Sequence, residues 1–520
     1  MSLKSDVFSL IDNARRLTRE CTDGEQLELQ LESLRKRLDT PLRVAVVGIM
    51  KAGKSTFMNA LIGADVVFTG DVETTYTVCW FRYGEKPGLT VCFRDGSQEQ
   101  ARFEDLKKWS VRAYETENPR IHDVKYLVIS YPAEILKVME FIDTPGLNSV
   151  YRKDAQNTLD FLAIQSDRDT VQEAGMADAV IYAFTRTAGG FDQKILEAFQ
   201  GSEGHGSSPI NSVGILTKAD ATGIWQVYDE VTPVEKARAV ARKVMENQEM
   251  RKLLFTVLPV CAKTCEGLSQ LEDRDYKSLQ LLTRLDPEDL QDLLSDAHQF
   301  KACQDQDYAC LGPLEGRCRL MDRLGQYGIL QLVTLMKKGL TREQMEREIQ
   351  SLCGIASVRK LLMTHFGNRT FLIKSQYIFS HLNGLAYQIR GSKNASPRLK
   401  EVCTEIIEQI EQLQSSVQNL KELKALQMFY GGQLQFNSKE ELQDFLRVTG
   451  EYGRSPEKRL GAKPQNSVAE LAKMALSKAN AWHAKEAYGW MMPGAYVQTA
   501  AIVARSYEQM YYHLSALLEE

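Results

Sequence analysis

The sequence contains no long run of apolar residues. One of the longest, VAVVGIM at residues 44–50, is far shorter than the roughly 20 residues that a helix needs to cross a bilayer. Residues 1–20 mix charged and apolar side chains and lack the continuous apolar segment of a secretory signal. We therefore expect a cytoplasmic chain without a membrane-spanning helix, and any membrane contact would be peripheral, on the inner face of the membrane.

An excess of positive charge is also missing. Lys plus Arg number 64 and Asp plus Glu number 68, which gives a net charge of −4. Because nucleic acid is bound mainly through clustered basic side chains, we do not expect it as a partner. The proportions of hydrophobic (43%) and charged (25%) residues are those of a globular protein, and 520 residues exceed what one core usually covers.

The ten cysteines lack the paired C-x-x-C spacing of a zinc site. Cys303, Cys310 and Cys318 are too far apart along the chain to supply it. We interpret the cysteines as reduced thiols, as is usual in a cytosol.

Short apolar runs rich in β-branched residues alternate with helical or polar stretches in the first half of the chain. They lie at residues 42–47, 77–81, 89–93, 124–131, 138–142, 178–184, 212–216 and 254–260. The sequence Arg94-Asp95-Gly96 predicts a hairpin turn. Strands interleaved with helices predict an α/β domain, with a mostly parallel sheet that is covered by helices on both faces.

The second half of the chain has the pattern of helices. Ser396-Pro397 predicts a helix start, and apolar residues three and four apart then continue from Leu399 to Leu420 like a coiled-coil seam. Residues 371–389 repeat this pattern, and residues 1–38 are also helical in pattern. Simple bundle packing and an oligomerising stalk both remain open for these helices.

We divide the chain into three parts on these patterns. Residues 1–40 are an N-terminal helical segment that packs on the C-terminal helices. Residues 41–365 are the α/β domain, with a core at 42–265 and an insertion with connecting helices at 266–365. Residues 366–520 are an all-α helical bundle or stalk. Residues 327–332 and 354–369 are candidate hinge helices.

Residues 48–55, GIMKAGKS, fit the phosphate-binding pattern G-x-x-x-x-G-K-[ST] between an apolar strand and a helix. Gly48 and Gly53 allow turns that aim backbone amides at a phosphate. Lys54 would reach the β and γ oxygens, and the Ser55 hydroxyl would bind Mg²⁺. The predicted contacts on this side are Gly48, Met50, Lys51, Ala52, Gly53, Lys54, Ser55 and Thr56.

A base-reading segment, TKAD, follows the apolar run SVGIL. Asp220 can accept hydrogen bonds from N1–H and the 2-amino group of guanine, which adenine cannot donate, and the stem of Lys218 can cover the base. CAK at residues 261–263 could offer backbone amides to the guanine oxygen. The predicted base-side contacts are Thr217, Lys218, Asp220, Cys261, Ala262 and Lys263. These features favour GTP over ATP.

Two further segments are candidates for sensing the γ-phosphate. DTPG at residues 143–146 follows the apolar run VMEFI, so that Asp143 can hold Mg²⁺ through water and the Gly146 amide can contact the γ-phosphate. In ETTYT at residues 73–77 we favour Thr75 as the threonine that closes over the metal. Thr74 and Thr77 are its rivals.

The order GIMKAGKS, ETT, DTPG, TKAD and CAK, followed by long helices, resembles the dynamin superfamily. GIMKAGKSTFMNALIG and TYTVCWFRYG resemble bacterial dynamin-like proteins, among them the LeoA type. The resemblance implies that residues 41–365 are a GTPase head on a helical neck and trunk. It also implies Mg²⁺-dependent GTP hydrolysis, binding of GTP and GDP, a homodimer through paired heads, and a role in membrane remodelling or secretion.

The sequence departs from the family pattern at three positions. Met50 and Lys51 stand where typical dynamins carry a glutamine and a serine that help to place the attacking water and a monovalent cation. Leu147 stands where Ras-like enzymes carry their catalytic glutamine. We predict that the Lys51 ammonium replaces the cation and that Thr75 and backbone groups position the water. A Lys51 that merely faces solvent is the alternative.

Two alternatives to the dynamin-like GTPase remain open. One is an Era- or TrmE-like GTPase in RNA or ribosome maturation, and the other is a nucleotide-gated scaffold that hydrolyses GTP slowly, as Met50 and Leu147 suggest. Residues 482–494, WHAKEAYGWMMPG, are a candidate membrane-contacting loop. Burial of these aromatic and methionine side chains in a core is the alternative interpretation.

Overall fold

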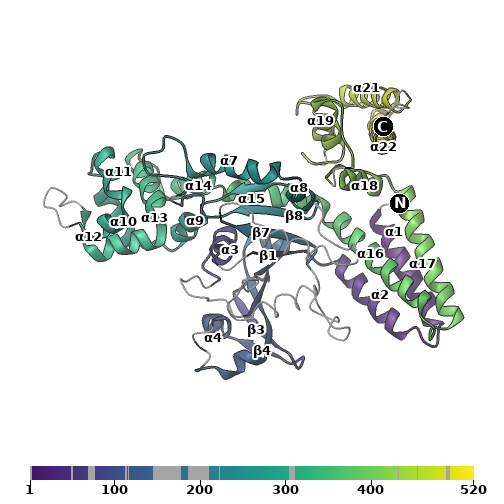
Figure 1. Cartoon of the computed structure of the whole chain (residues 1–520), viewed down its shortest axis with the longest axis horizontal. Coiled ribbons are helices and arrows are strands. Elements are labelled where there is room, and N and C mark those ends of the chain that lie inside the picture. Colours follow the sequence, from purple (N-terminus) through teal and green to yellow (C-terminus); the bar gives the residue numbers. More distant parts are fainter. Residues whose placement is uncertain are drawn as a thin grey trace.

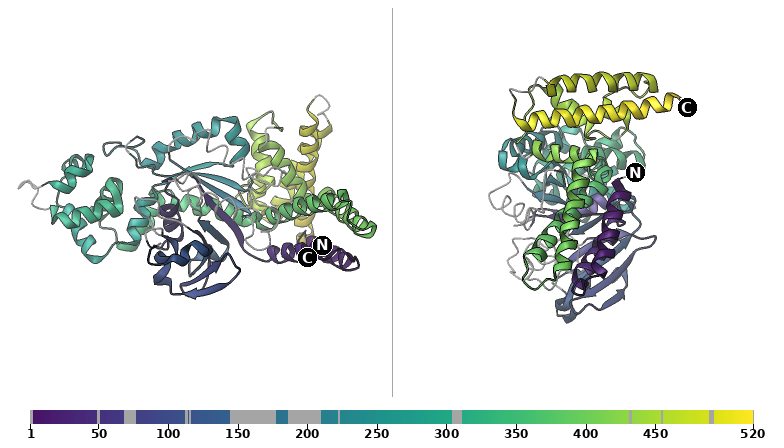
Figure 2. Two further views of the ribbon diagram at one scale, coloured as in Figure 1. Left: turned by 60° about the horizontal axis from the view of Figure 1, so that its bottom comes forward. Right: turned by 90° about the vertical axis from the view of Figure 1, so that its right-hand side faces the viewer.

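The structure is a computed structural model of the whole chain. It describes all residues except 1–2, 49–50, 68–76, 112–113, 115, 144–176, 186–209, 222, 304–310, 431–432, 454, 488–491 and 520. A central sheet lies between a helical lobe and a helical body that contains both ends of the chain (Figure 1). The same three-part arrangement is visible when the molecule is turned (Figure 2).

The sheet has nine strands in the order β4-β3-β5-β2-β6-β1-β7-β8-β9. Their bounds are β1 Leu42–Val47, β2 Val78–Tyr83, β3 Gly88–Phe93, β4 Gln98–Ala101, β5 Val124–Tyr131, β6 Met139–Asp143, β7 Ala179–Phe184, β8 Ser212–Leu216 and β9 Val257–Pro259. From β6 to β9 all neighbours are parallel. At the other end, β2 is antiparallel to β6, and β3 is antiparallel to both β4 and β5. The expected α/β class is confirmed, with a mixed sheet.

The burial of the strands explains which of them could be predicted from the sequence. Strands β6, β7 and β8 are buried along their whole length, so they read as continuous apolar runs. Strand β4, with the sequence QEQA, is an exposed edge strand and has no apolar pattern. It follows the predicted hairpin turn, where Gly96 has a φ of 85° and the Asp95 carboxylate accepts the Ser97 amide at 2.8 Å.

Helices on both sides of the sheet connect these strands and extend into the lobe. Those near the sheet are α3 Lys54–Ile62, α7 Pro233–Glu246, α8 Gln248–Leu253, α9 Ala262–Ser269, α14 Arg342–Leu352 and α15 Ile355–Leu361. The short helix α4 Leu106–Ser110 lies beside β5. The lobe consists of α10 Asp273–Leu282, α11 Pro287–Ser295, α12 Ala297–Ala302 and the first part of α13 Leu314–Lys337. Helix α13 is kinked at Gly325, which has a φ of 68° and a ψ of 178°.

The helical body combines the first and last parts of the chain. Helices α1 Leu3–Arg19 and α2 Glu25–Leu38 pack together and contact α17 Pro397–Ser416 and α16 Thr370–Gly391, respectively. The remaining helices are α18 Gln418–Tyr430, α19 Lys439–Val448, α20 Pro456–Leu460, α21 Val468–Ala487 and α22 Gly494–Glu519. Helices α21 and α22 lie side by side (Figure 2). The division of the chain at residues 40 and 365 stays a proposal.

The predicted helix start at Ser396 is present, but the predicted seam is interrupted. The Ser396 hydroxyl accepts the Leu399 amide at 3.1 Å and caps α17. At Val417 the backbone leaves the helical region, with a φ of −83° and a ψ of 116°, and α18 then packs mainly on α22. The expectation of one continuous stripe to Leu420 was therefore wrong, because its last turn belongs to a different helix pair.

The candidate membrane-contacting segment is partly buried. Trp482 lies on α21 with 1% of its surface exposed, and its ring is 6.3 Å from that of Phe436. Trp482 is thus a core residue, and its proposed membrane contact was wrong. Tyr488, Trp490 and Met491 lie outside the described residues. Among the residues that the structure describes, no helix has both the length and the apolarity needed to cross a bilayer.

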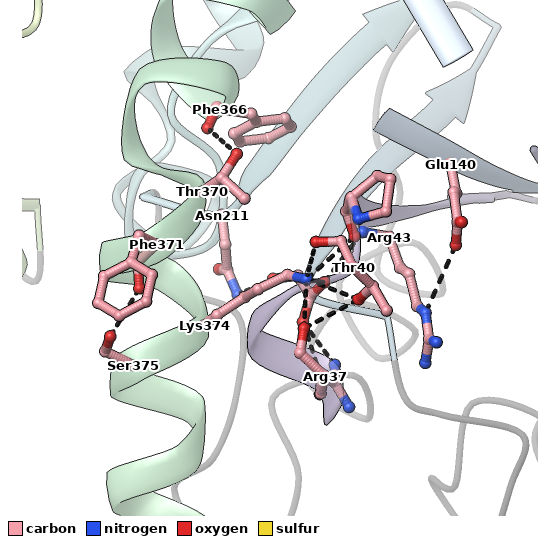
Figure 3. Close-up of polar contacts among 12 residues, drawn as sticks. Arg37, Thr40, Arg43, Glu140, Asn211, Phe366, Thr370, Phe371, Lys374 and Ser375 are labelled. Carbon is pink, nitrogen blue, oxygen red and sulfur yellow. Dashed lines mark hydrogen bonds and ion pairs between the residues drawn. The ribbon is translucent and has the colours of Figure 1, made fainter. Parts of the chain in front are cut away.

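A buried polar cluster joins the helical body to the sheet (Figure 3). Lys374 reaches from α16 to the turn between α2 and β1, where its ammonium donates to the carbonyls of Arg37 at 2.7 Å and Thr40 at 2.6 Å. The Arg37 guanidinium pairs with Asp178 at 2.6 Å, and Asp178 also accepts the Arg43 amide at 2.9 Å. All of these groups lie at the amino ends of β1 and β7, opposite the predicted nucleotide site.

Candidate functional site

Four of the predicted segments meet at one edge of the sheet. Residues 48–55 follow β1, Asp143 ends β6, residues 217–220 follow β8, and residues 261–263 follow β9. These strands belong to the parallel run β6-β1-β7-β8-β9 of the sheet. Ligands of open α/β sheets bind at the carboxyl ends of the strands, so this edge is the candidate nucleotide site.

The phosphate loop has a backbone that only certain residues can adopt. Gly48 has a φ of 153°, and a Cβ added there would lie 2.1 Å from the Ala183 carbonyl oxygen on β7. Gly53, at the N-terminus of α3, has a φ of 76°, and Lys51 has a φ of 60°. Gly48 is therefore packed against the sheet, and Lys51 and Gly53 have the left-handed backbone that tight turns of a phosphate loop require.

Lys54 and Ser55 begin α3 directly after these turns. Lys54 is 7% exposed, and its ammonium donates to the Gly48 carbonyl at 3.2 Å. Burial lowers the pKa of Lys54, and the nearby Asp143 carboxylate opposes that shift. A cation held in a place of low polarity interacts strongly with an anion that enters it.

Ser55 and Asp143 supply the donors that Mg²⁺ prefers. The Ser55 hydroxyl donates to an Asp143 carboxylate oxygen at 3.3 Å, and Asp143 is fully buried at the end of β6. Hydroxyl and carboxylate oxygens suit this hard cation, which usually keeps several waters and takes further oxygens from substrate phosphates. No cluster of three His, Cys, Asp or Glu side chains able to hold a metal occurs within the described ranges.

Thr217 connects the base-side segment to the phosphate loop. Its hydroxyl lies 2.6 Å from the Ala52 carbonyl oxygen and 3.0 Å from that of Phe184, and its amide donates to Phe184 at 2.9 Å. Thr217 is 1% exposed and holds the loop in place, and its contact with the nucleotide stays a prediction. Lys218 follows with a φ of 53° and is exposed, and its Cε lies 3.9 Å from the point where a Cβ on Gly53 would be.

Asp220 lies between β8 and β9, where a base would be read. It is partly buried, and burial raises its pKa, while Lys263 and Lys218 act in the opposite direction. The amide of Cys261 donates to the Cys353 carbonyl at 3.0 Å. Helix α9 begins at Ala262, so the base-side amides in this segment are those of Ala262 and Lys263, which have no acceptor within their own helix.

The remaining predicted site residues differ in exposure, and the structure describes only some of them. Thr77 is 3% exposed and its hydroxyl lies 3.5 Å from the Trp109 carbonyl oxygen, so this rival for the switch threonine is a core residue. Lys51 is exposed, and Thr56 is partly buried. The structure does not describe Met50, Thr74, Thr75, Gly146 and Leu147, and the predictions on these five residues stand as made.

Three polar side chains on α3 and next to it were missed in the sequence analysis. Asn59 on α3 is fully buried and bonds to Glu266 on α9 at 2.6 Å. Arg359 on α15 donates to the carbonyls of Leu61 at 2.8 Å and Ala60 at 3.2 Å, which lie at the C-terminal end of α3. Asn59 within the apolar helix FMNALI was the one available signal, because a buried amide needs partners.

The chain is similar to a family model and to several known proteins. Residues 44–187 match the family model described as "Dynamin family". The "Isoniazid-induced protein IniC" of Mycobacterium tuberculosis is 25% identical over 460 residues, which cover 88% of each chain. "Dynamin-like protein 2" of Campylobacter jejuni is 33% identical over 136 residues, or 26% of this chain and 21% of that protein.

The chain is also similar to one further relative and to a solved structure. The "Bacterial dynamin-like protein" of Nostoc punctiforme is 36% identical over 126 residues, or 22% of this chain and 18% of that protein. A solved structure described as an oligomerised bacterial dynamin pair is 13% identical with a TM-score of 0.34, over 99% of this chain and 91% of that chain. The family match over residues 44–187 and the order of the site segments together show that the chain contains a dynamin-family domain and is similar to bacterial dynamin-like proteins.

Proposed function

We propose that the chain binds and hydrolyses GTP with Mg²⁺ at the carboxyl edge of its sheet. The observation that carries this proposal is the direct connection between the phosphate and base segments. Thr217, at the start of the base-reading segment, bonds to Ala52 in the phosphate loop at 2.6 Å. Each segment is common by itself, but a fixed spacing between them is what a nucleotide requires.

Three residues on the phosphate side of the site have separate roles. The buried Lys54 ammonium offsets the charge of the β and γ oxygens, where loss of water strengthens the attraction. Ser55 and Asp143 would hold Mg²⁺, which supplies charge neutralisation when it is bound. The amides at the start of α3 add a favourable site for an anion.

The base side selects guanine through Asp220. Its carboxylate must be ionised to accept two hydrogen bonds, and the neighbouring Lys218 and Lys263 favour the ionised form against the effect of burial. In partly desolvated surroundings each hydrogen bond to N1–H and the 2-amino group is stronger than in water. Adenine would leave the carboxylate without these donors, at a penalty of about 2–3 kcal/mol.

The attacking water requires a different arrangement from that of typical dynamins. We keep the proposal that the Lys51 ammonium replaces the missing cation, which the exposed position and left-handed backbone of Lys51 allow. Thr75 and backbone groups would then position the water. If Lys51→Ala hydrolyses GTP at the wild-type rate, this role of Lys51 is wrong.

The helical body would respond to the nucleotide through α15 and α16. Arg359 on α15 bonds to the end of α3, and the chain continues through residues 362–369 into α16 of the body. We propose that movements at the nucleotide site pass along this connection to a stalk made of residues 1–40 and 366–520, and that two heads pair during turnover. Work at a membrane, as remodelling or secretion, is the proposed outcome.

Phosphate release measured over a range of protein concentrations tests the proposal. Wild-type protein with Mg²⁺ and GTP should release phosphate, and the rate per molecule should rise with concentration if heads pair. Addition of liposomes tests the membrane role in the same assay, and Lys54→Ala is the inactive control. GTP uptake without turnover would favour a nucleotide-gated scaffold, which Met50 and Leu147 suggest.

A further inference from the structure

Asn59 is a fully buried amide one helical turn after Ser55 on α3. Its neighbours along the helix, Phe57, Met58 and Ala60, are buried apolar residues. A buried amide destabilises a protein unless its two donors and its acceptor lone pairs find partners. The partners of Asn59 therefore show what this residue does.

The Asn59 side chain holds the chain that leaves α3. Its oxygen accepts the amides of Val66 at 3.0 Å and Val67 at 2.7 Å, and its nitrogen donates back to the Val67 carbonyl at 2.7 Å. Val66 and Val67 are themselves buried. The backbone at Val67 is thus paired by a side chain as it would be by a neighbouring strand, eight residues before Thr75.

The same Asn59 nitrogen also donates to the Glu266 carboxylate at 2.6 Å. Glu266 is 7% exposed and lies on α9, the helix that begins in the base-side segment. Helix α9 cannot shift easily, because a Cβ on Gly267 would lie 2.0 Å from the Arg323 carbonyl oxygen and the Thr264 hydroxyl bonds to the Leu324 carbonyl at 3.3 Å. Glu266 therefore anchors Asn59 to a rigid part of the site.

We propose that Asn59 is a positioning residue for GTP hydrolysis. Through Val66 and Val67 it sets the point from which the predicted switch segment begins, and through Glu266 it fixes that point relative to the base-side helix. This inference rests on the proposed function. It predicts that the Asn59–Glu266 pair matters for the step that depends on the γ-phosphate and matters little for binding of the base and the first two phosphates.

Asn59→Asp tests the pair with almost no change in volume. The variant keeps an oxygen for the amides of Val66 and Val67, but its second oxygen takes the place of the nitrogen and faces the Glu266 carboxylate and the Val67 carbonyl. Glu266→Gln alone is the matched control, because the glutamine oxygen still accepts from Asn59. In the double variant the glutamine amide at 266 can donate to the new carboxylate at 59, so the contact is restored with donor and acceptor exchanged.

The measurements are kcat and KM for GTP and the affinity for GDP. We expect Asn59→Asp to lower kcat by about tenfold or more while KM and GDP affinity stay within about threefold. We expect the double variant to recover part of the lost kcat, because the contact between positions 59 and 266 is restored while the Val67 carbonyl still lacks its donor. Wild-type kcat in Asn59→Asp would overturn the proposal. An equal loss of kcat and GDP affinity that Glu266→Gln does not rescue would also overturn it, because that pattern indicates a merely structural role.

Failure of the proposed function can be told apart from failure of this inference. If wild-type protein binds no GTP, the proposed function is wrong, and hydrogen exchange still tests the contact itself. The amides of Val66 and Val67 should exchange slowly in the wild type and at least about tenfold faster in Asn59→Ala. Equal exchange in the two proteins would contradict the positioning role whatever the nucleotide result.

Discussion

Two buried lysines lie at opposite edges of the same sheet and differ in their surroundings. Lys374, at the amino edge, is fully buried, and its ammonium contacts the carbonyls of Arg37, Thr40 and Pro41 and the Thr40 hydroxyl within 3.0 Å. Lys54, at the carboxyl edge, donates to the Gly48 carbonyl of a loop shaped for an anion. Burial lowers the pKa of both, that of Lys374 to about 8.

The carboxylates at the two edges show the same contrast. Asp178 accepts from the guanidinium of Arg37 and the amide of Arg43, which are fixed protein donors. Asp143 accepts from the Ser55 hydroxyl, the group that we propose as a ligand of Mg²⁺. Charges at the amino edge therefore join the helical body to the sheet, whereas charges at the carboxyl edge surround the candidate nucleotide site. Substitutions at the two edges should affect different properties.

Lys54→Ala should have the largest effect on function. Loss of the ammonium removes the charge that faces the phosphates, so kcat/KM for GTP should fall by about a thousandfold or more. The free energy of unfolding should change by less than about 1 kcal/mol, because the substitution relieves the burial of a cation. Steady-state kinetics and urea unfolding check the two parts. A large loss of stability would remove the contrast with Lys374.

Lys374→Met should have the opposite profile. It leaves the turn carbonyls without their donor and weakens the surroundings of Asp178, so the free energy of unfolding should fall by about 3 kcal/mol. Folded protein should still bind GTP with nearly wild-type affinity. Lys393→Met, at an exposed position on the turn after α16, is the matched control and should change stability by less than about 0.5 kcal/mol. Equal stability of the two variants would contradict a structural role for Lys374.

A second cluster of buried charges, near the amino end of β8, should make the free energy of unfolding depend on pH. Glu451 pairs with Arg369 at 2.9 Å and lies 3.3 Å from His365, whose other ring nitrogen bonds to the Ile210 carbonyl before β8. Although burial acts in the other direction, Arg369 and His365 lower the pKa of Glu451 from 4.5 to about 2. The folded state therefore binds this proton more weakly than the unfolded chain, and the stabilisation is complete above pH 4.5 and lost as the pH falls toward 2.

Glu451→Gln checks this pH dependence. Wild-type protein should lose up to about 3 kcal/mol of unfolding free energy through this group between pH 4.5 and 2, and the variant should lack that part of the slope. Burial also lowers the pKa of His365, so both proteins should lose stability as the pH falls below its usual value of 6.5. Parallel curves for the two proteins between pH 4.5 and 2 would show that Glu451 is not the group responsible.

The sequence predicted the parallel part of the sheet and the carboxyl-edge segments for one reason. Buried parallel strands are continuous apolar runs, and the phosphate loop needs glycines at fixed spacing, so both leave a local pattern. Strand β4 and the break at Val417 have no such pattern, because an edge strand is solvent-exposed and the end of α17 depends on which helix α18 contacts.

The amino-edge clusters could not be predicted from the sequence. Arg37 and Asp178 are 141 positions apart, and Lys374 bonds to the turn at Thr40 from 334 positions away. Neither pair has a spacing that marks it, and only tertiary packing brings the residues together. The same holds for Asn59 and Glu266, 207 positions apart, although a polar residue within an apolar helix could have been noted.

Titration calorimetry of the whole protein with Mg²⁺ and either GTP or ATP tests the central claim most directly. We predict that GTP binds and that ATP binds at least about a hundredfold more weakly, because adenine leaves Asp220 without its donors. Asp220→Asn should lose this preference and accept xanthosine triphosphate, whose base offers the complementary pattern. No uptake of GTP, or equal uptake of ATP by the wild type, would contradict the account.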